Sequence, residues 1–270
     1  MNNHLVTIAV PSYNHGEYIH YCLDGIRDEG YSNKEILIID DGSSDDSIEK
    51  IMQWKSKNPK ISLTLIARKN KGLNATLNEL VANANGEFIC FIASDDILLK
   101  DAVSSRLKVF EKRPEKYAVI GDAKVINSTN DIIMDSAIED LYRGNKENYK
   151  DDSRLLSSVV KEWSVPGPVL MVRKDLYKII GPYPEKQFAE DINFYMKVVG
   201  LRLLAFIDHP VALYRIHSYN TGGNSKFSKQ LSMAFIRAYI GNIKYYPFKL
   251  QLIILKRLAG RFYLYLKAYL

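Results

Sequence analysis

The sequence predicts an α/β protein with one domain built on a mixed, mainly parallel central sheet and a helical appendage at its C-terminus. Strand-like and helix-like segments alternate over the first two thirds of the 270 residues, which is typical of sheets covered by helices. Two of the first four predicted strands end at adjacent aspartates. The last 46 residues contain nine lysines and arginines and no acidic residue. Because the whole chain carries a net charge of +6, its first 224 residues carry −3.

Seven segments alternate between strand and helix in the first 93 residues. The first is an apolar run that Pro11 closes, and the second repeats apolar residues at the helical spacing i, i+3, i+4 and i+7. The predicted elements are, in order, strand 5–11, helix 19–26, strand 35–40, helix 45–57, strand 61–67, helix 72–83 and strand 87–93.

After residue 100 the alternation is less regular. Residues 127–165 are polar and weakly periodic, which predicts a hairpin or a long loop over a site. Gly222, Gly223 and Asn224 mark the best boundary, so we expect a domain over 1–224 and a basic amphipathic helical tail over 225–270. The remaining predicted elements are helix 101–112, strand 117–122, strand 168–173, helix 174–180, helix 190–199 and strands 203–207 and 211–217.

Adjacent carboxylates stand at the ends of two predicted strands. Asp40 and Asp41 come at the end of the second strand, and Asp95 and Asp96 come just after the fourth. Open α/β sheets bind ligands at the carboxyl ends of their strands, which predicts a site here. Each pair also has a plain structural interpretation, as a turn whose polar side chains cap the following helix.

The composition disfavours several classes of protein. The N-terminus leads directly into a strand, and no stretch of about 18 residues is apolar enough to span a membrane, so we expect a cytoplasmic protein. Cys22 and Cys90 lie in apolar patterns, which predicts buried free thiols rather than a disulfide or a metal site. The net acidic domain shows no nucleic-acid-binding motif, so we expect no nucleic-acid partner.

Seven motifs occur in the order known from one enzyme family, each at the end of a predicted element. They are VTIAVPSYNHGEYIHYCLDGI, IIDDGSSDDS, NKGLNATLN, FIASDD, GPVLMVRKDLYKIIGPYPE, FAEDINFYMKV and YRIH. With these motifs, over roughly residues 5 to 220, the chain resembles the family 2 glycosyltransferases, whose fold is the Rossmann-like GT-A fold.

The resemblance implies an inverting transfer of a sugar from a nucleotide-sugar, with a UDP-sugar as the expected donor, to a hydroxyl of a glycan or lipid-linked saccharide. A carboxylate can accept an N–H of the base, and the resemblance assigns this role to Asp41. Lys71 and Gly72 open a helix, where backbone N–H groups and a cation can meet the donor. The full expected set of nucleotide-sugar-binding residues is Pro11, Ser12, Tyr13, Asp41, Lys71, Gly72 and Asp95.

The resemblance also implies a divalent cation, Mn²⁺ or Mg²⁺, which would stabilise the leaving diphosphate as a Lewis acid. Asp96 is the expected direct ligand and Asp95 its neighbour or a ribose partner, although the two can exchange roles. His217 matches a family position that often completes the metal site. Many family members carry a further aspartate two places before Asp95, where this chain has Ala93.

An inverting transfer needs a carboxylate that takes the proton of the acceptor hydroxyl. By resemblance Asp191 is this base, and Glu190 supports it or binds the acceptor. The plain alternative is that both acids stand at a helix N-terminus because the helix dipole favours them there.

Two other functions compete with this interpretation. A sugar nucleotidyltransferase would show a glycine-rich basic loop after the first strand, where this chain reads PSYNHGEY. A catalytically weak, transferase-like scaffold at the membrane is the non-enzymatic alternative, and Ala93 favours it slightly. The tail interleaves aromatic and aliphatic residues with lysine and arginine, as helices at a bilayer interface do. We expect the tail either to make a peripheral membrane contact or to pack on the body or on a second subunit of a homo-oligomer.

Overall fold

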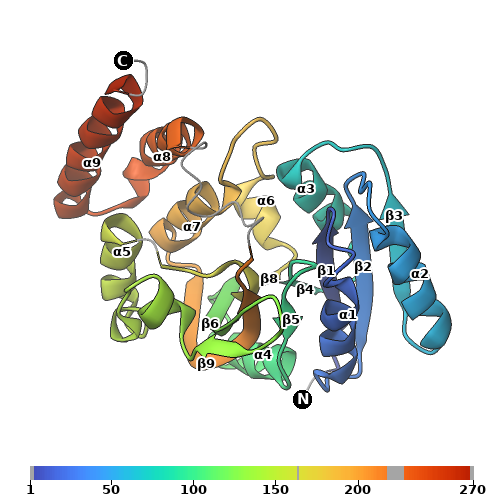
Figure 1. Cartoon of the computed structure of the whole chain (residues 1–270). Helices are drawn as coiled ribbons and strands as arrows, with labels where there is room; N and C mark the ends of the chain where they lie inside the picture. The colour runs from blue at the N-terminus through green and yellow to red at the C-terminus, as the bar shows by residue number, and fades with distance from the viewer. Residues whose placement is uncertain (1–2, 163, 218–227, 268–270) are drawn as a thin grey trace.

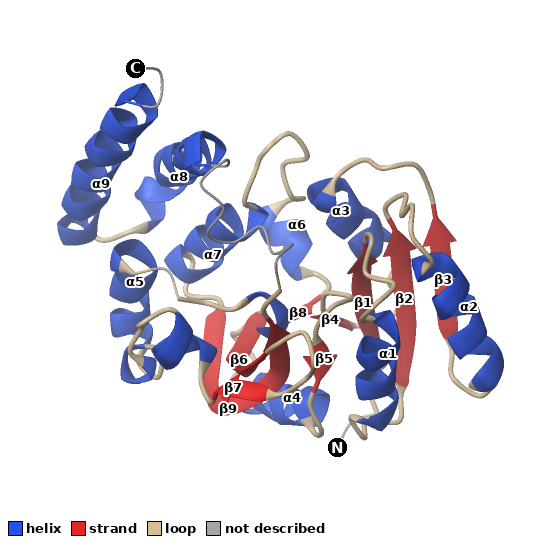
Figure 2. Ribbon diagram, viewed as in Figure 1, coloured by secondary structure: helices blue, strands red, loops and turns tan. Residues whose placement is uncertain are grey.

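The computed structural model describes residues 3–162, 164–217 and 228–267, and its strands form one nine-stranded sheet (Figures 1 and 2). The strands are β1 Val6–Ser12, β2 Lys34–Asp40, β3 Leu63–Ala67, β4 Phe88–Phe91, β5 Ile97–Leu98, β6 Ala118–Ile126, β7 Ile132–Met134, β8 Leu170–Arg173 and β9 Leu204–Arg215. The α-helices are α1 Ile19–Asp28, α2 Ser47–Lys57, α3 Leu73–Asn83, α4 Ala102–Lys112, α5 Asp152–Lys161, α6 Leu176–Ile180, α7 Glu190–Gly200, α8 Ser228–Asn242 and α9 Phe248–Lys267.

The first half of the sheet is parallel. β1 pairs with β2 on one side and with β4 on the other, and β3 pairs with β2. Residues 6–10 and 36–40 are buried throughout because helices cover both faces of a parallel sheet. The register of β1 and β2 runs from Val6 opposite Lys34 to Ser12 opposite Asp40, so their carboxyl ends are level.

The second half mixes directions. The strand order is β3-β2-β1-β4-β8-β6-β9-β5, with β7 paired to β6. β8 runs antiparallel to both β4 and β6, whereas β9 runs parallel to β6 along most of its length. The predicted α/β class and the mixed, mainly parallel sheet are confirmed. Cys22 and Cys90 lie in the core as free thiols, as predicted.

The prediction of two separate strands at 203–207 and 211–217 was wrong, because β9 is one strand. It stays paired with β6 through register shifts around Asp122. A Cβ atom on Gly121 would lie 2.7 Å from the carbonyl oxygen of His209, so the close approach at this irregularity requires glycine. Because of this bulge, residues 204–215 form one continuous strand, although the sequence pattern indicates two.

The segment 127–165 contains a hairpin, one of the two expected alternatives, in which β7 folds back on β6. It also contains α5, a helix of 10 residues. Asp151 caps this helix by accepting hydrogen bonds from the backbone N–H groups of Ser153 and Arg154, at 3.0 and 2.9 Å. Buried Leu155, Leu156, Val159 and Val160 share its inner face. The sequence analysis did not predict α5 because its short apolar pattern is surrounded by polar residues.

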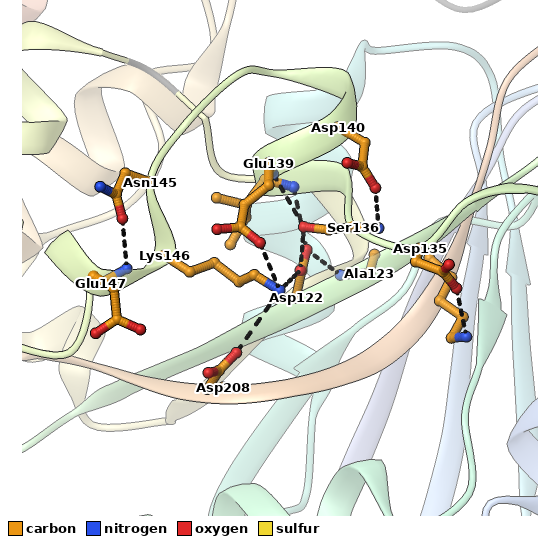
Figure 3. A network of polar contacts seen from close by, with 12 residues as sticks. Asp122, Ala123, Asp135, Ser136, Glu139, Asp140, Asn145, Lys146, Glu147 and Asp208 are labelled. Atoms are coloured by element: carbon orange, nitrogen blue, oxygen red, sulfur yellow. Dashed lines mark hydrogen bonds and ion pairs between the residues drawn. The ribbon is translucent and has the colours of Figure 1, made fainter.

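A buried carboxylate holds this segment against the sheet (Figure 3). Asp122 of β6 accepts hydrogen bonds from the hydroxyl of Ser136 at 2.6 Å and from the backbone N–H of Ala123 at 2.8 Å. The ammonium of Lys146 lies 3.2 Å from Asp122, 3.2 Å from Glu139 and 3.8 Å from Asp208. This one lysine therefore connects the segment to β6 and β9.

The C-terminal helices pack on the body of the domain. α8 contacts α7, and α9 contacts both α8 and α5 at the outer side of the molecule (Figure 1). The hydroxyl of Tyr246 donates a hydrogen bond to the carbonyl of Met196 at 2.8 Å. The predicted boundary at residues 222–224 lies outside the described residues. None of the helices in the described ranges is long and apolar enough to cross a membrane.

Candidate active site

Asp40 shapes the turn after β2. Its buried carboxylate accepts hydrogen bonds from the hydroxyl of Ser12 at 3.1 Å, and from the backbone N–H and hydroxyl of Ser43 at 2.8 and 2.6 Å. Gly42 has a φ of 81°, and a Cβ atom there would lie 2.8 Å from the backbone nitrogen of Asn70. The turn therefore needs glycine at this position, and it delivers Asp41 to the carboxyl edge of the sheet.

Asp41 holds the loop that leads from β3 into α3. Its carboxylate accepts hydrogen bonds from the backbone N–H groups of Lys71 at 2.7 Å and Gly72 at 2.9 Å, and from the guanidinium of Arg68. Its own N–H donates to the carbonyl of Ser12 at 2.8 Å. Four of the predicted donor-binding residues, namely Ser12, Asp41, Lys71 and Gly72, therefore meet at one point.

Arg68 is a site residue that the sequence analysis missed. Its guanidinium also donates to Glu79 at 2.6 Å and to the hydroxyl of Thr76 at 2.9 Å. The Lys71 ammonium, which was expected to face the donor, lies 2.7 Å from Glu79. Arg68 directly follows the third parallel strand, so its position at a strand end was the available signal.

The predicted wall of the nucleoside pocket lies at the end of β1. Ser12 is buried and Pro11 half-buried, whereas the side chain of Tyr13 is 49% exposed. An exposed aromatic ring beside a buried strand end is available to stack on a flat ligand.

Asp95, His217 and His15 converge after β4. The Nε2 atom of His217 lies 3.0 Å from a carboxylate oxygen of Asp95, and the Nδ1 atom of His15 lies 3.6 Å from the other oxygen. Nδ1 of His15 also lies 2.8 Å from the hydroxyl of Ser94. The ligand atoms of the three residues all lie within 4.8 Å of one another. His15 was not predicted, although it stands within the motif that follows the first strand.

Asp96 lies beside this group and contacts the backbone of β9. Its carboxylate accepts a hydrogen bond from the N–H of Arg215 at 2.8 Å, and the guanidinium of Arg215 donates to the carbonyl of Asp95 at 2.7 Å. That guanidinium also lies 4.6 Å from the ring centre of Tyr18. Arg215, which the sequence analysis did not single out, therefore fixes both aspartates to the last strand.

The two aspartates differ in the direction of their pKa shift. Burial, and then the neighbouring Asp95 carboxylate, raise the pKa of Asp96 well above its usual range. Burial also acts to raise the pKa of Asp95, but the hydrogen bond from His217 and the charge of His15 outweigh it, so this pKa is lowered. The two pKa shifts therefore run in opposite directions, and the carboxyl with the lowered pKa is Asp95, which faces the two imidazoles.

The donor set of His15, Asp95 and His217 fits a divalent cation. Two imidazole nitrogens and one carboxylate oxygen can surround one ion, and Mn²⁺ accepts both kinds of ligand. Ala93 supplies no carboxylate, and the third donor of the group comes from His15 instead. Within the described residues, Asp96 does not belong to this group.

Asp191 stands in the first turn of α7, where Glu190 is the first residue. Ala189 before them has a φ of 54°, which starts the helix abruptly. Desolvation raises the pKa of Tyr142, a hydrogen bond with Tyr214 lowers it, and the charges of Asp191 and Asp96 raise it further. The hydroxyl of Tyr142 is thus within electrostatic range of both carboxylates.

Comparisons with known proteins agree with this architecture. The family model described as glycosyl transferase family 2 matches residues 7–180. Chondroitin synthase of Escherichia coli is 34% identical over 108 residues, which cover 40% of this chain and 16% of that protein. The putative glycosyltransferase EpsH of Bacillus subtilis is 28% identical over 220 residues, which cover 80% of this chain and 62% of that protein. The chain thus spans less than two thirds of the length of either relative.

Solved structures resemble this chain over most of its length. The mannosyltransferase PcManGT of Pyrobaculum calidifontis, in complex with GDP-Man and Mn²⁺, superposes with a TM-score of 0.68 at 18% identity and covers 98% of this chain and 72% of that one. S. aureus TarS 1-349 in complex with UDP-GlcNAc superposes with a TM-score of 0.70 at 17% identity and covers 95% and 72%. These likenesses show the GT-A glycosyltransferase fold. Since the family model matches more than half of its residues, the chain belongs to glycosyl transferase family 2.

Proposed function

We propose that this protein transfers a sugar, with inversion, from a nucleotide-sugar donor to a hydroxyl of a glycan or lipid-linked saccharide, and that the donor is a UDP-sugar. The observation that supports it best is the group of His15, Asp95 and His217, located at the strand ends where the sheet also delivers Asp41. The family match favours this reaction over a sugar nucleotidyltransferase.

Asp41 recognises the base in this proposal. A carboxylate offers about four lone-pair sites for hydrogen bonds. The N–H groups of Lys71 and Gly72 and the guanidinium of Arg68 use three of them, which leaves one for an N–H of the base. Pro11, Ser12 and Tyr13 form the wall beside it. A UDP-GlcNAc complex in one neighbour and a GDP-Man complex in another support a nucleotide-sugar donor, and uracil is our choice of base.

His15, Asp95 and His217 would hold the metal, Mn²⁺ or Mg²⁺. The sequence made Asp96 the first choice of ligand, and the contacts favour the exchanged assignment, in which Asp96 positions Asp95 through Arg215. A bound divalent cation neutralises the charge that develops on the leaving diphosphate. The Mn²⁺ complex of the mannosyltransferase with the same fold supports this choice of ion.

Asp191 takes the proton from the acceptor hydroxyl as its oxygen attacks the anomeric carbon. Glu190 supports this base or binds the acceptor. The electrostatic influence of both Asp191 and Asp96 on Tyr142 supports a base on the metal side of the site. We propose that the protein works at the cytoplasmic face of a membrane, where lipid-linked acceptors are found.

The test is a panel of sugar nucleotides, including UDP-glucose, UDP-GlcNAc, UDP-glucuronate and GDP-mannose, assayed for donor hydrolysis with Mn²⁺ and with EDTA. We expect hydrolysis of one UDP-sugar that EDTA abolishes. Nucleotide binding without turnover of any donor would instead support the scaffold alternative. Undiminished turnover in EDTA would contradict the metal assignment.

A further inference from the structure

The last helix carries a second apolar face that the body of the protein does not cover. The inner face of α9 is packed, with Ile254 fully buried. Seven large apolar side chains of this helix are between 44 and 71% exposed, and all but Leu264 share another face. We call these six the outer stripe: Phe248, Leu252, Leu255, Phe262, Tyr263 and Leu266. Single exposed apolar residues are ordinary on soluble proteins, but a continuous set of this kind marks an interaction surface.

The outer stripe is narrow and long. At 100° per residue its six positions fall within an arc of about 100°, and they extend over about 27 Å of helix. Lys249 and Lys256, both exposed, are seven residues apart and border the stripe on one side. The helix therefore presents an apolar band with cations directly beside it.

Other cations of the tail are used for packing. A guanidinium nitrogen of Arg257 donates to the carbonyl of Lys161 in α5, and Arg261 lies over the ring of Phe235 in α8 at 3.9 Å. Burial lowers the pKa of Arg261, as expected for a guanidinium held inside a contact. These two arginines anchor α9 against α5 and α8, and the side chains of the outer stripe remain exposed. The helix itself lies at the outer side of the molecule (Figure 2).

We propose that the outer stripe docks on the surface of an anionic lipid bilayer, with α9 lying in the plane of the interface. Helices of this kind bury an apolar face at the boundary between headgroups and acyl chains, and their lysines contact anionic headgroups. The tail has no acidic residue that a negatively charged surface would repel. No described helix can span the bilayer, which agrees with a helix that lies on it.

The positive charge of the tail also makes a second copy of the chain a poorer partner for the outer stripe than anionic lipid. A symmetric contact between two outer stripes would bring the lysines of both copies together. Because residues 225–270 contain nine cations and no acid, nothing in the tail could pair with these charges. Charge complementarity thus favours anionic lipid over self-association through this face.

The experiment is co-sedimentation of the full chain with vesicles of equal parts phosphatidylcholine and phosphatidylglycerol. We expect the wild type to pellet at low salt and the double variant Leu252→Glu, Leu255→Glu to lose at least about tenfold in vesicle affinity, because each change places a charge in the apolar band. Met52→Glu on α2 is the matched control, since Met52 is 50% exposed on a helix far from the tail. This control should pellet like the wild type.

A second pair of variants tests the electrostatic part. Lys249→Gln with Lys256→Gln should weaken binding to these vesicles and leave the weak binding to pure phosphatidylcholine unchanged. Lys57→Gln with Lys60→Gln, which removes two exposed lysines elsewhere, should have no effect. A wild type that stays in the supernatant, or a stripe variant that pellets like the wild type, overturns the proposal. The proposal is also overturned if the wild type forms a dimer in the absence of vesicles and the Leu252→Glu, Leu255→Glu variant is a monomer.

The biological role of this membrane contact rests on the proposed function, because a transferase with a lipid-linked acceptor works at a membrane. Vesicle binding needs neither donor nor metal, whereas donor hydrolysis needs no vesicle. If the protein hydrolyses a donor but does not bind vesicles, the outer stripe proposal is wrong and the transferase proposal is unaffected. If it binds vesicles but hydrolyses no donor, the transferase proposal is wrong and the outer stripe proposal is unaffected.

Discussion

The imidazole of His217 and the carboxylate of Asp95 meet at 3.0 Å although 122 residues separate them in the sequence. The end of β9 brings His217 there, and the backbone of the preceding Arg215 is held by Asp96. The ring of His217 stacks on Tyr18 with 5.2 Å between centroids, so the imidazole is fixed from two sides. This contact is the geometric centre of the proposed metal site.

Removal of either histidine should weaken the metal site. We expect His217→Ala and His15→Asn each to lower the affinity for Mn²⁺ at least about tenfold, since changes to the partners of metal ligands alone cost roughly that much. Calorimetric titration with Mn²⁺ measures this directly. His4→Ala is the control, because His4 also contacts a carboxylate, Glu87 at 2.7 Å, at the opposite end of the sheet. Equal losses in His4→Ala and His15→Asn would refute the assignment of His15.

Asp191→Asn should cut turnover by roughly 10²–10⁴-fold, which is the usual cost of losing a general base. Affinity for the nucleoside diphosphate should persist, because Asp191 faces the acceptor in our proposal. Steady-state kinetics and a UDP titration separate the two effects. Asp175→Asn, an exposed aspartate at the start of α6 without a capping hydrogen bond, is a matched control that should retain turnover. Loss of nucleotide binding with full turnover at saturating donor would contradict the role.

Asp41→Asn should weaken UDP binding by roughly tenfold, or about 1.4 kcal/mol, and reduce the preference for UDP over GDP. The amide replaces one acceptor oxygen with a donor, which opposes both the base and the N–H groups of Lys71 and Gly72. Glu79→Gln is the control, since it disturbs Arg68 but leaves these two backbone hydrogen bonds in place. If both variants lose affinity and both keep base selectivity, Asp41 only holds the loop.

A fourth prediction concerns how α5 is attached. Asp152 accepts hydrogen bonds from the buried ammonium of Lys116 at 2.8 Å and from Arg113 at 2.9 Å. Asp152→Asn should destabilise the fold by about 1–3 kcal/mol in urea denaturation, because it leaves the buried ammonium with poorer partners. Asp135→Asn is the control, since that side chain is 85% exposed in its pair with Lys124 and should cost under about 1 kcal/mol.

The same contact predicts a dependence on pH. Burial acts to raise the pKa of Asp152, but Lys116 and Arg113 outweigh it, so the folded pKa lies below the ordinary value of 3.8. A depressed pKa stabilises the fold fully above the unfolded pKa, and this stabilisation is lost as pH falls through the folded value. The difference in unfolding free energy between wild type and Asp152→Asn should therefore shrink below about pH 4. A difference that stays constant down to pH 2 would contradict this account.

The sequence by itself determined the α/β class, the order of most elements and the strand ends that carry carboxylates. These features are local: apolar periodicity sets strand or helix, and glycine and aspartate mark the turns. The motifs that resemble family 2 glycosyltransferases added the candidate residues at those ends. The prediction of two strands in place of β9 was wrong because the apolar pattern is interrupted at a bulge. Only the pairing with β6 keeps the strand continuous there.

Tertiary structure alone decided which of these residues meet. His15, Arg68 and Arg215 are ordinary polar residues in the sequence, and only strand pairing brings them against Asp95, Asp41 and Asp96. The first two contacts follow from the parallel pairs β1–β4 and β2–β3, and the third from the antiparallel pair β5–β9. The same holds for α9, whose apolar residues divide into a packed face and the outer stripe only once α8 and α5 cover one side. Secondary structure follows from interactions between near neighbours in the chain, whereas a site depends on atoms from distant segments, and their separation is set by the packing of the whole domain.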